Sequence, residues 1–202
     1  MRSLFSRAHL HTSSRVPTLP AFPVDAAMRR DPLRVSTISE PTGSFGLTAR
    51  RAAQQLLRDR ARSVLVVSPE RREGASTVAV NLATACALDN SRTLLLSADL
   101  RHPRAELLLS ATGEPGLRQL LNHLNAGRHV DLADWCHTSR VPGLSVIPAG
   151  APLGGHIDEL GAKIKELYGL SKRWADITIT DAPAVGDGED AEFLARHADI
   201  VV

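Results

Sequence analysis

The sequence is short of cysteine, aromatic residues and long apolar runs. Two cysteines among 202 residues cannot build a disulfide framework or a zinc cluster by themselves. Aromatic residues make up 3% of the chain, which leaves few platforms on which single-stranded bases could stack. No apolar run reaches the roughly 18 residues that a membrane-spanning helix needs. These absences favour a reduced, cytoplasmic protein and make nucleic acid an unexpected partner.

Positive charge is concentrated at the start of the chain. Residues 1–62 contain eleven basic and four acidic residues (11 − 4 = +7), whereas residues 63–202 contain thirteen basic and eighteen acidic ones (13 − 18 = −5). Prolines interrupt residues 1–43, which are also rich in arginine and serine. We therefore predict a basic, disordered leader over residues 1–43 and a folded domain over residues 44–202. Two other interpretations of the leader stay open: an organellar transit peptide, or an arm that contacts anionic lipid or another acidic surface.

Short apolar segments that alternate with helix-sized segments predict an α/β fold. The apolar segments suit strands that are buried on both faces, and the segments between them have the composition and period of helices. Together they imply a parallel sheet with helices on both faces. A further strand begins at Asp199, so the sheet is expected to be incomplete at its C-terminal end. Strands are expected at residues 63–68, 93–96, 144–148 and 177–180, and helices at residues 44–63, 76–88, 157–174 and 191–198.

Three polar loops follow the first, second and fourth of these strands: PERREGAST, SADLRHP and DAPA. In open parallel sheets, ligands bind beyond the carboxyl ends of the strands. The first loop has the outline of a phosphate-binding loop, because its backbone amides would point at an anion from the start of the next helix. Gly74 supplies a flexible backbone there. Ser76 or Thr77 supplies the hydroxyl that such loops place on Mg²⁺.

The order of the three loops resembles the cytoplasmic domain of bacterial tyrosine kinases (BY-kinases), which control capsule and exopolysaccharide chain length. This family belongs to the deviant-Walker P-loop ATPases, which also include division-site and plasmid-partition ATPases. The resemblance covers residues 44–202. It is carried by the segments SVLVVSPERREGASTVAVNLATA, TLLLSADLRHPR and ITITDAPAVGDGEDAEFLARHADIVV, which correspond to the family's Walker A, Walker A′ and Walker B segments.

The resemblance implies a P-loop NTPase-like fold with a nucleotide site whose cofactors are ATP and Mg²⁺. It assigns the catalytic positions to Asp99 and Asp181, and it places Mg²⁺ against Ser76, Asp99 and Asp181. The implied nucleotide-binding residues are Glu73, Gly74, Ala75, Ser76, Thr77 and Arg101.

Four positions depart from the family's motifs. Ala75 stands where the Walker A lysine is expected, and Pro69 heads that loop where Gly or Ala is usual. Ser97 stands at the first Walker A′ aspartate, and Ala184 replaces the second Walker B proline. A charge-assisted hydrogen bond from such a lysine contributes roughly 1.5–3 kcal/mol, and one well-placed cation changes phosphoryl-transfer rates by about 10³–10⁵-fold. We therefore expect the catalytic positions to be vestigial and ATP and Mg²⁺ to bind weakly or not at all.

Several other residues have an expected role. Arg71 and Arg72 lie in the first loop, where they could replace the missing cation or form a solvated loop tip. Asp187 is expected to be a solvated loop acid, whereas Asp190 matches an Asp-Ala pair of the family. Tyr168 is the only tyrosine and is expected to pack against the core, although BY-kinases carry a C-terminal tyrosine cluster.

Three functions fit the sequence. The favoured one is a degenerate BY-kinase-like protein that lacks phosphotransfer and acts in capsule or exopolysaccharide biosynthesis as a non-catalytic or regulatory component. The second is an active tyrosine kinase or ATPase that uses Arg71 or Arg72, and the third is a division-site or partition-type ATPase.

The resemblance also implies partners. One is a membrane-spanning polysaccharide co-polymerase or adaptor chain, which would hold the protein at the inner face of the membrane. A second copy of the chain is the other. The family's Glu-x-x-Arg-x-x-Arg oligomerisation motif is not matched at either Arg50 or Arg51, which places ring formation in doubt.

Overall fold

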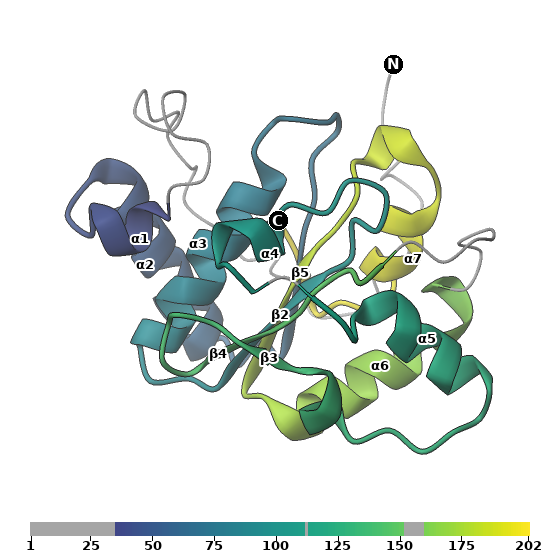
Figure 1. Ribbon diagram of the computed structural model, residues 1–202. Coiled ribbons are helices and arrows are strands. Elements are labelled where there is room, and N and C mark those ends of the chain that lie inside the picture. Colours follow the sequence, from purple (N-terminus) through teal and green to yellow (C-terminus); the bar gives the residue numbers. More distant parts are fainter. Residues whose placement is uncertain (1–34, 112, 152–159) are drawn as a thin grey trace.

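The computed structural model describes residues 35–111, 113–151 and 160–202, and its centre is a six-stranded sheet (Figure 1). The strands are β1 (Ser63–Val66), β2 (Thr93–Ser97), β3 (His137–Thr138), β4 (Leu144–Ile147), β5 (Ile177–Asp181) and β6 (Ile200–Val201). Their spatial order is β3-β4-β2-β5-β1-β6. All neighbours pair in parallel except β3 and β4, which are antiparallel.

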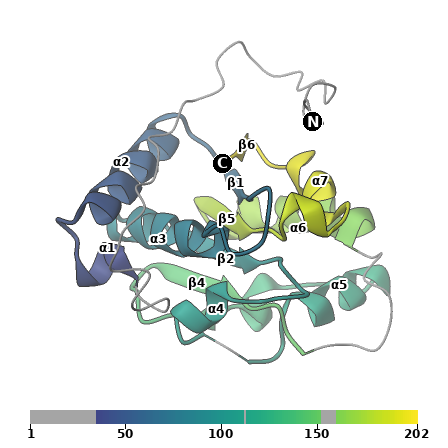
Figure 2. The same ribbon diagram turned by 90° about the horizontal axis from the view of Figure 1, so that it is seen from above.

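Helices cover both faces of the sheet (Figure 2). They are α1 (Ser36–Ser39), α2 (Ser44–Arg58), α3 (Ala75–Leu88), α4 (Ala105–Leu108), α5 (Leu117–Asn125), α6 (Leu160–Trp174) and α7 (Asp190–Ala195), with 3₁₀ turns η2 (Leu132–Trp135) and η3 (Val185–Asp187). One apolar core lies under α2, α3 and α4, and the other lies under α5, α6 and α7. No helix in the described part of the chain is long and apolar enough to cross a membrane.

The central strands are buried on both faces, which explains their unbroken apolar sequences. In β1, Val64 and Val66 enter the core under α3, and Leu65 enters the core on the opposite face. Every residue of β1, β2 and β5 is buried. The predicted parallel sheet with helices on both faces is therefore confirmed, and the one antiparallel pair is at its edge.

The antiparallel edge strand β3 was not expected from the sequence. His137 and Thr138 are its only residues, so it is too short to show an alternating pattern. His137 lies opposite Val146 of β4, and its ring is within 2.8 Å of the carbonyl oxygen of Pro115.

The described part of the fold begins before the expected boundary at residue 44. Ser36 and Thr37 of α1 are buried, and Thr37 is bound to Asn81 of α3. The amide and hydroxyl of Thr37 both donate to Asn81 Oδ1, at 2.8 and 2.9 Å. Asn81 in turn donates from Nδ2 to the carbonyl oxygen of Thr77 at 2.9 Å. Residues 1–34 of the predicted leader lie outside the described residues.

Replacing Asn81 with alanine is expected to destabilise the fold by about 1–3 kcal/mol, because the buried Thr37 amide loses its acceptor. Urea unfolding measures the change. Gln54→Ala on the exposed face of α2 is the control and should stay within about 0.5 kcal/mol of the parent. Equal stabilities of the Asn81 and Gln54 variants would contradict the structural role of this contact.

Candidate functional site

The three polar loops meet at the carboxyl edge of the sheet because β5 lies between β1 and β2. The carbonyl oxygen of Asp181 accepts hydrogen bonds from the amides of Ala98 and Asp99, at 2.8 and 3.0 Å. On the other side, the amide of Val185 donates to the carbonyl oxygen of Ser68 at 3.0 Å. These main-chain bonds hold the loops that follow β1, β2 and β5 against one another.

The loop after β1 has the backbone of a phosphate-binding loop. Gly74 is the N-cap of α3 and has φ 101°, a left-handed conformation that favours glycine. A Cβ at Gly74 would meet nothing within 4 Å, so the backbone is open on that side. No side chain caps the first turn of α3, and amides there are free to bind an anion. Glu73 instead serves the loop itself, since its Oε2 accepts from the amide of Glu70 at 3.0 Å.

The cation that normally completes such a loop is missing. Ala75 presents a methyl group at the first position of α3. The sequence contains three lysines, Lys163, Lys165 and Lys172, and all of them are in α6, on the other face of the sheet from α3. No lysine therefore replaces the one that the motif lacks.

Asp181 is a fully buried carboxylate at the end of β5. Neither of its carboxylate oxygens has a hydrogen-bond partner among the described residues. Burial raises the pKa of Asp181 to about 8, and the negative charges of Asp99 and Glu106 add to this rise. The Ser76 hydroxyl is close enough to oppose the rise, although it lies outside hydrogen-bond geometry.

An unpartnered carboxylate beside a hydroxyl fits a hard divalent cation such as Mg²⁺. Ser76, Asp99 and Asp181 are the residues that would hold it, as the sequence predicts. The described residues contain no group of three or more His, Cys, Asp or Glu side chains placed to bind a metal. The cation would therefore need further oxygen ligands from water and from the phosphates of a nucleotide.

The expectation that Asp187 is a solvated loop acid is wrong. Its side chain is 12% exposed, and both carboxylate oxygens accept from Arg71 Nε at 2.7 Å. This hydrogen bond lowers the pKa of Asp187. Arg71 is thus tied to the loop after β5, although its side chain is 54% exposed. No local sequence pattern indicates this pair, because its members are far apart in the chain.

Arg101, predicted to bind nucleotide, contacts the same loop. Its Nη1 donates to the carbonyl oxygen of Asp187, and its Nη2 lies 3.2 Å from Asp190 Oδ2. Asp99 stabilises the turn that carries Arg101, since its Oδ1 accepts a hydrogen bond from the amide of His102 at 3.0 Å. The structure therefore brings the residues of the predicted site together, but the two nearby arginines face carboxyl and carbonyl groups of the β5 loop.

Glu106 is a residue of this region that the sequence analysis missed. It is 6% exposed and accepts a hydrogen bond from the hydroxyl of Ser97. The one sequence feature that could have indicated a buried acid here is the single glutamate within the apolar run AELLL.

Tyr168 has the packing role expected for it. The side chain is 3% exposed, and its hydroxyl lies 3.1 Å from the hydroxyl of Thr180 in β5. Burial raises the pKa of Tyr168 to about 12. The one tyrosine of the chain is therefore a core residue of α6.

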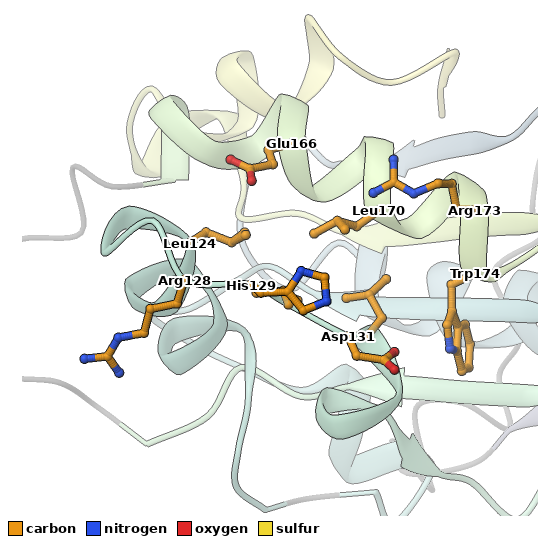
Figure 3. Close-up of a pocket in the computed structure, with 10 residues that line it drawn as sticks. Leu124, Arg128, His129, Asp131, Glu166, Leu170, Arg173 and Trp174 are labelled. Carbon is orange, nitrogen blue, oxygen red and sulfur yellow. The ribbon is translucent and has the colours of Figure 1, made fainter.

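A pocket of about 410 Å³ lies away from these loops, between α5, α6 and the segment after α5 (Figure 3). None of the predicted site residues lines it. Because α6 ends here just before β5 begins, the pocket is at the opposite edge of the sheet. Apolar, basic and acidic side chains are mixed in its lining, which consists of Leu124, Arg128, His129, Val130, Asp131, Leu132, Glu166, Leu170, Arg173 and Trp174.

Comparison with known proteins agrees with the loop geometry. No protein-family model matches the chain. The tyrosine-protein kinase ptk of Acinetobacter johnsonii is 28% identical over 213 residues, covering 96% of this chain and 28% of that protein. The putative tyrosine-protein kinase EpsB of Ralstonia solanacearum is 30% identical over 155 residues, covering 76% of this chain and 20% of that protein. The chain thus spans less than a third of the length of these two relatives.

Solved structures share the fold. The kinase domain of the Escherichia coli tyrosine kinase ETK superposes with a TM-score of 0.78 at 18% identity, covering 92% of this chain and 76% of that one. The septum site-determining protein MinD from Pyrococcus horikoshii, complexed with Mg-ADP, has a TM-score of 0.59 at 24% identity, covering 69% of this chain and 56% of that one. Fold and loops together define a P-loop protein of the deviant-Walker class. Within that class, the chain is BY-kinase-like, because its sequence is similar to ptk and EpsB and its fold is similar to the ETK kinase domain.

The stability of the protein is expected to fall as pH rises because of Asp181. Its folded-state pKa of about 8 lies above the ordinary value of 3.8, so the stabilising effect of its proton is complete below about pH 4 and is lost as pH rises through about 8. Asp181→Asn removes this effect. Relative to the parent, the variant should gain roughly 2–4 kcal/mol between pH 5 and pH 8.

Urea unfolding of both proteins at the two pH values measures this difference. Asp134→Asn is the matched control, because Asp134 is an exposed carboxylate and its replacement should leave the pH dependence unchanged. A gap between parent and Asp181→Asn that is equal at pH 5 and pH 8 would rule out the protonated, buried state of Asp181.

Proposed function

We propose that this chain is a degenerate BY-kinase-like P-loop protein that does not transfer phosphate. It acts as a non-catalytic or regulatory component of exopolysaccharide or capsule biosynthesis. The observation that carries the proposal is the methyl group of Ala75 at the cation position of an otherwise intact phosphate-binding loop. Phosphoryl transfer depends on positioning and charge stabilisation, and a methyl group provides neither.

The remaining features support weak nucleotide binding. The uncapped first turn of α3 offers amides to phosphate oxygens, and the open side of Gly74 allows a close approach. Ser76 and Asp181 would hold Mg²⁺, which would neutralise phosphate charge when bound. The buried carboxylate of Asp181 would also gain the partner that it lacks.

The burial of Tyr168 makes it a poor phosphate acceptor. Tyr168 is the only tyrosine of the chain, and it is buried with its hydroxyl against Thr180. Autophosphorylation at this residue would need α6 to leave the core.

The partner that we propose is a membrane-spanning co-polymerase or adaptor chain, which would place the protein at the cytoplasmic face of the membrane. Two relatives that carry the name tyrosine-protein kinase are more than three times as long as the segment that this chain matches. We also propose a second copy of this chain as a partner.

A second candidate function is an active kinase or ATPase that uses Arg71 as its cation. Arg71 lies in the phosphate-binding loop, and its half-exposed side chain donates to Asp187. Solvent screens an ion pair whose cation is half exposed, and surface pairs contribute about 0.2–1 kcal/mol. A phosphate group could therefore compete with Asp187 for the guanidinium.

The proposed function predicts no phosphotransfer by the purified protein with ATP and Mg²⁺. Hydrolysis of ATP and labelling of the protein by γ-labelled ATP should both equal those of Asp181→Asn. Turnover at ordinary kinase rates that disappears in Asp181→Asn would overturn the proposal. Loss of that turnover in Arg71→Ala, but not in Arg72→Ala, would establish the second candidate.

Restoring the cation is expected to restore affinity. Ala75→Lys should tighten ATP binding by about 10- to 100-fold, because a charge-assisted hydrogen bond contributes roughly 1.5–3 kcal/mol. Fluorescence titration with a labelled ATP analogue measures it. Ala75→Met is the matched control, since it adds a long side chain without charge, and an equal gain in both variants would contradict the charge argument.

A further inference from the structure

Glu106 is a buried carboxylate that the proposed function does not use. It lies in α4 and is 6% exposed. Its Oε2 accepts from the hydroxyl of Ser97, and its Oε1 accepts from the amide of Ala149 at 3.2 Å. The two bonds join the end of β2 to Ala149, two residues after the end of β4. Both oxygens of Glu106 therefore have donors, unlike those of Asp181.

This carboxylate stands beside the position where the family motif carries an aspartate. Ser97 is the last residue of β2 and is in register with Asp181 of β5. The charge of Glu106 reaches Asp181, whose ionisation it opposes. The Walker A′ arm of the site thus keeps a carboxyl group, but that group comes from α4.

Ser97 and Glu106 are chemically matched. A serine hydroxyl donates a hydrogen bond to a buried carboxylate, which would otherwise be unsatisfied. An aspartate at position 97 would bring a second carboxylate to the same place, where two like charges cannot both ionise without a large cost. The motif residue at position 97 and the acid at position 106 therefore exclude each other.

We propose that Glu106 is a positioning residue whose carboxylate supplies the negative charge of the missing Walker A′ aspartate. Hydrogen bonds from Ser97 and Ala149 hold this carboxylate in place. Ser97 and Glu106 form one unit. The unit fixes α4 against the loop that contains Asp99, and it prevents repair of the motif by a change at position 97 alone. The proposal concerns this pair and not nucleotide binding, so its failure would leave the absence of phosphotransfer untouched.

The test is a double-mutant cycle that uses urea unfolding at pH 8. Ser97→Asp should raise the unfolding equilibrium constant by roughly 10- to 100-fold more than Ser97→Asn, which has the same size without the charge. Adding Glu106→Gln to Ser97→Asp should remove most of this excess. Adding Glu70→Gln, which neutralises an exposed acid, should not remove it.

The outcomes separate charge from shape. A specific rescue of Ser97→Asp by Glu106→Gln supports the proposal, including the case in which the single variant fails to fold and the double variant folds. Equal effects of Ser97→Asp and Ser97→Asn overturn it, because a purely steric role would not distinguish them. A double variant that is no more stable than Ser97→Asp, or that also fails to fold, overturns it too.

A second readout addresses the site itself. In Ser97→Asp/Glu106→Gln, the motif acid lies in register with Asp181 and without the competing carboxylate. The melting temperature of this variant should therefore rise with MgCl₂ more than with NaCl of the same ionic strength. The parent and Glu106→Gln alone should show a smaller Mg²⁺-specific rise, and equal rises in all three proteins would overturn the positioning role of Glu106.

Discussion

The burial of one acid at the end of the central strand constrains the whole site. Asp181 cannot move to water, because its main-chain oxygen holds the start of the loop after β2 and its strand is paired on both sides. The cost of burying its carboxylate must be met by a proton, by a cation or by a donor. In an ATPase of this architecture, a metal would meet it. Without a metal, burial raises the pKa of Asp181, the negative charges of Asp99 and Glu106 add to this rise, and a proton meets the cost.

Two arginines lie near the site, but their guanidinium groups contact Asp187. Arg71 and Arg101 both contact the loop after β5, through the side chain and the carbonyl of Asp187. The Arg71 contact ties the phosphate-binding loop to the loop after β5, and the Arg101 contact ties the loop after β2 to the same place. The same arrangement leaves Ala75 without a cation. The site therefore has the backbone of a nucleotide pocket, but its two arginines are bonded to groups of the protein itself.

The sequence predicted the sheet well and the site's contacts poorly, for physical reasons. Buried parallel strands such as β1 and β5 have continuous apolar sequences, and Gly74 marks a turn that needs a left-handed backbone. The motif order also located Asp99 and Asp181. By contrast, the Arg71–Asp187 pair and the Ser97–Glu106 pair join segments whose proximity depends on strand order. No local pattern encodes either one, and α1 was missed because one turn of helix has no readable period.

The contact between α1 and α3 links two parts of the molecule that the chain separates. Asn81 accepts from Thr37 with one side-chain atom and donates to Thr77 with another. The chain segment at α1 and the first turn of α3 are consequently connected by side-chain hydrogen bonds. A pull on the chain ahead of Val35 would therefore act on α3 through the bonds between Thr37 and Asn81, as well as on α2, and Asn81 lies within about two turns of the end of α3 that follows the phosphate-binding loop.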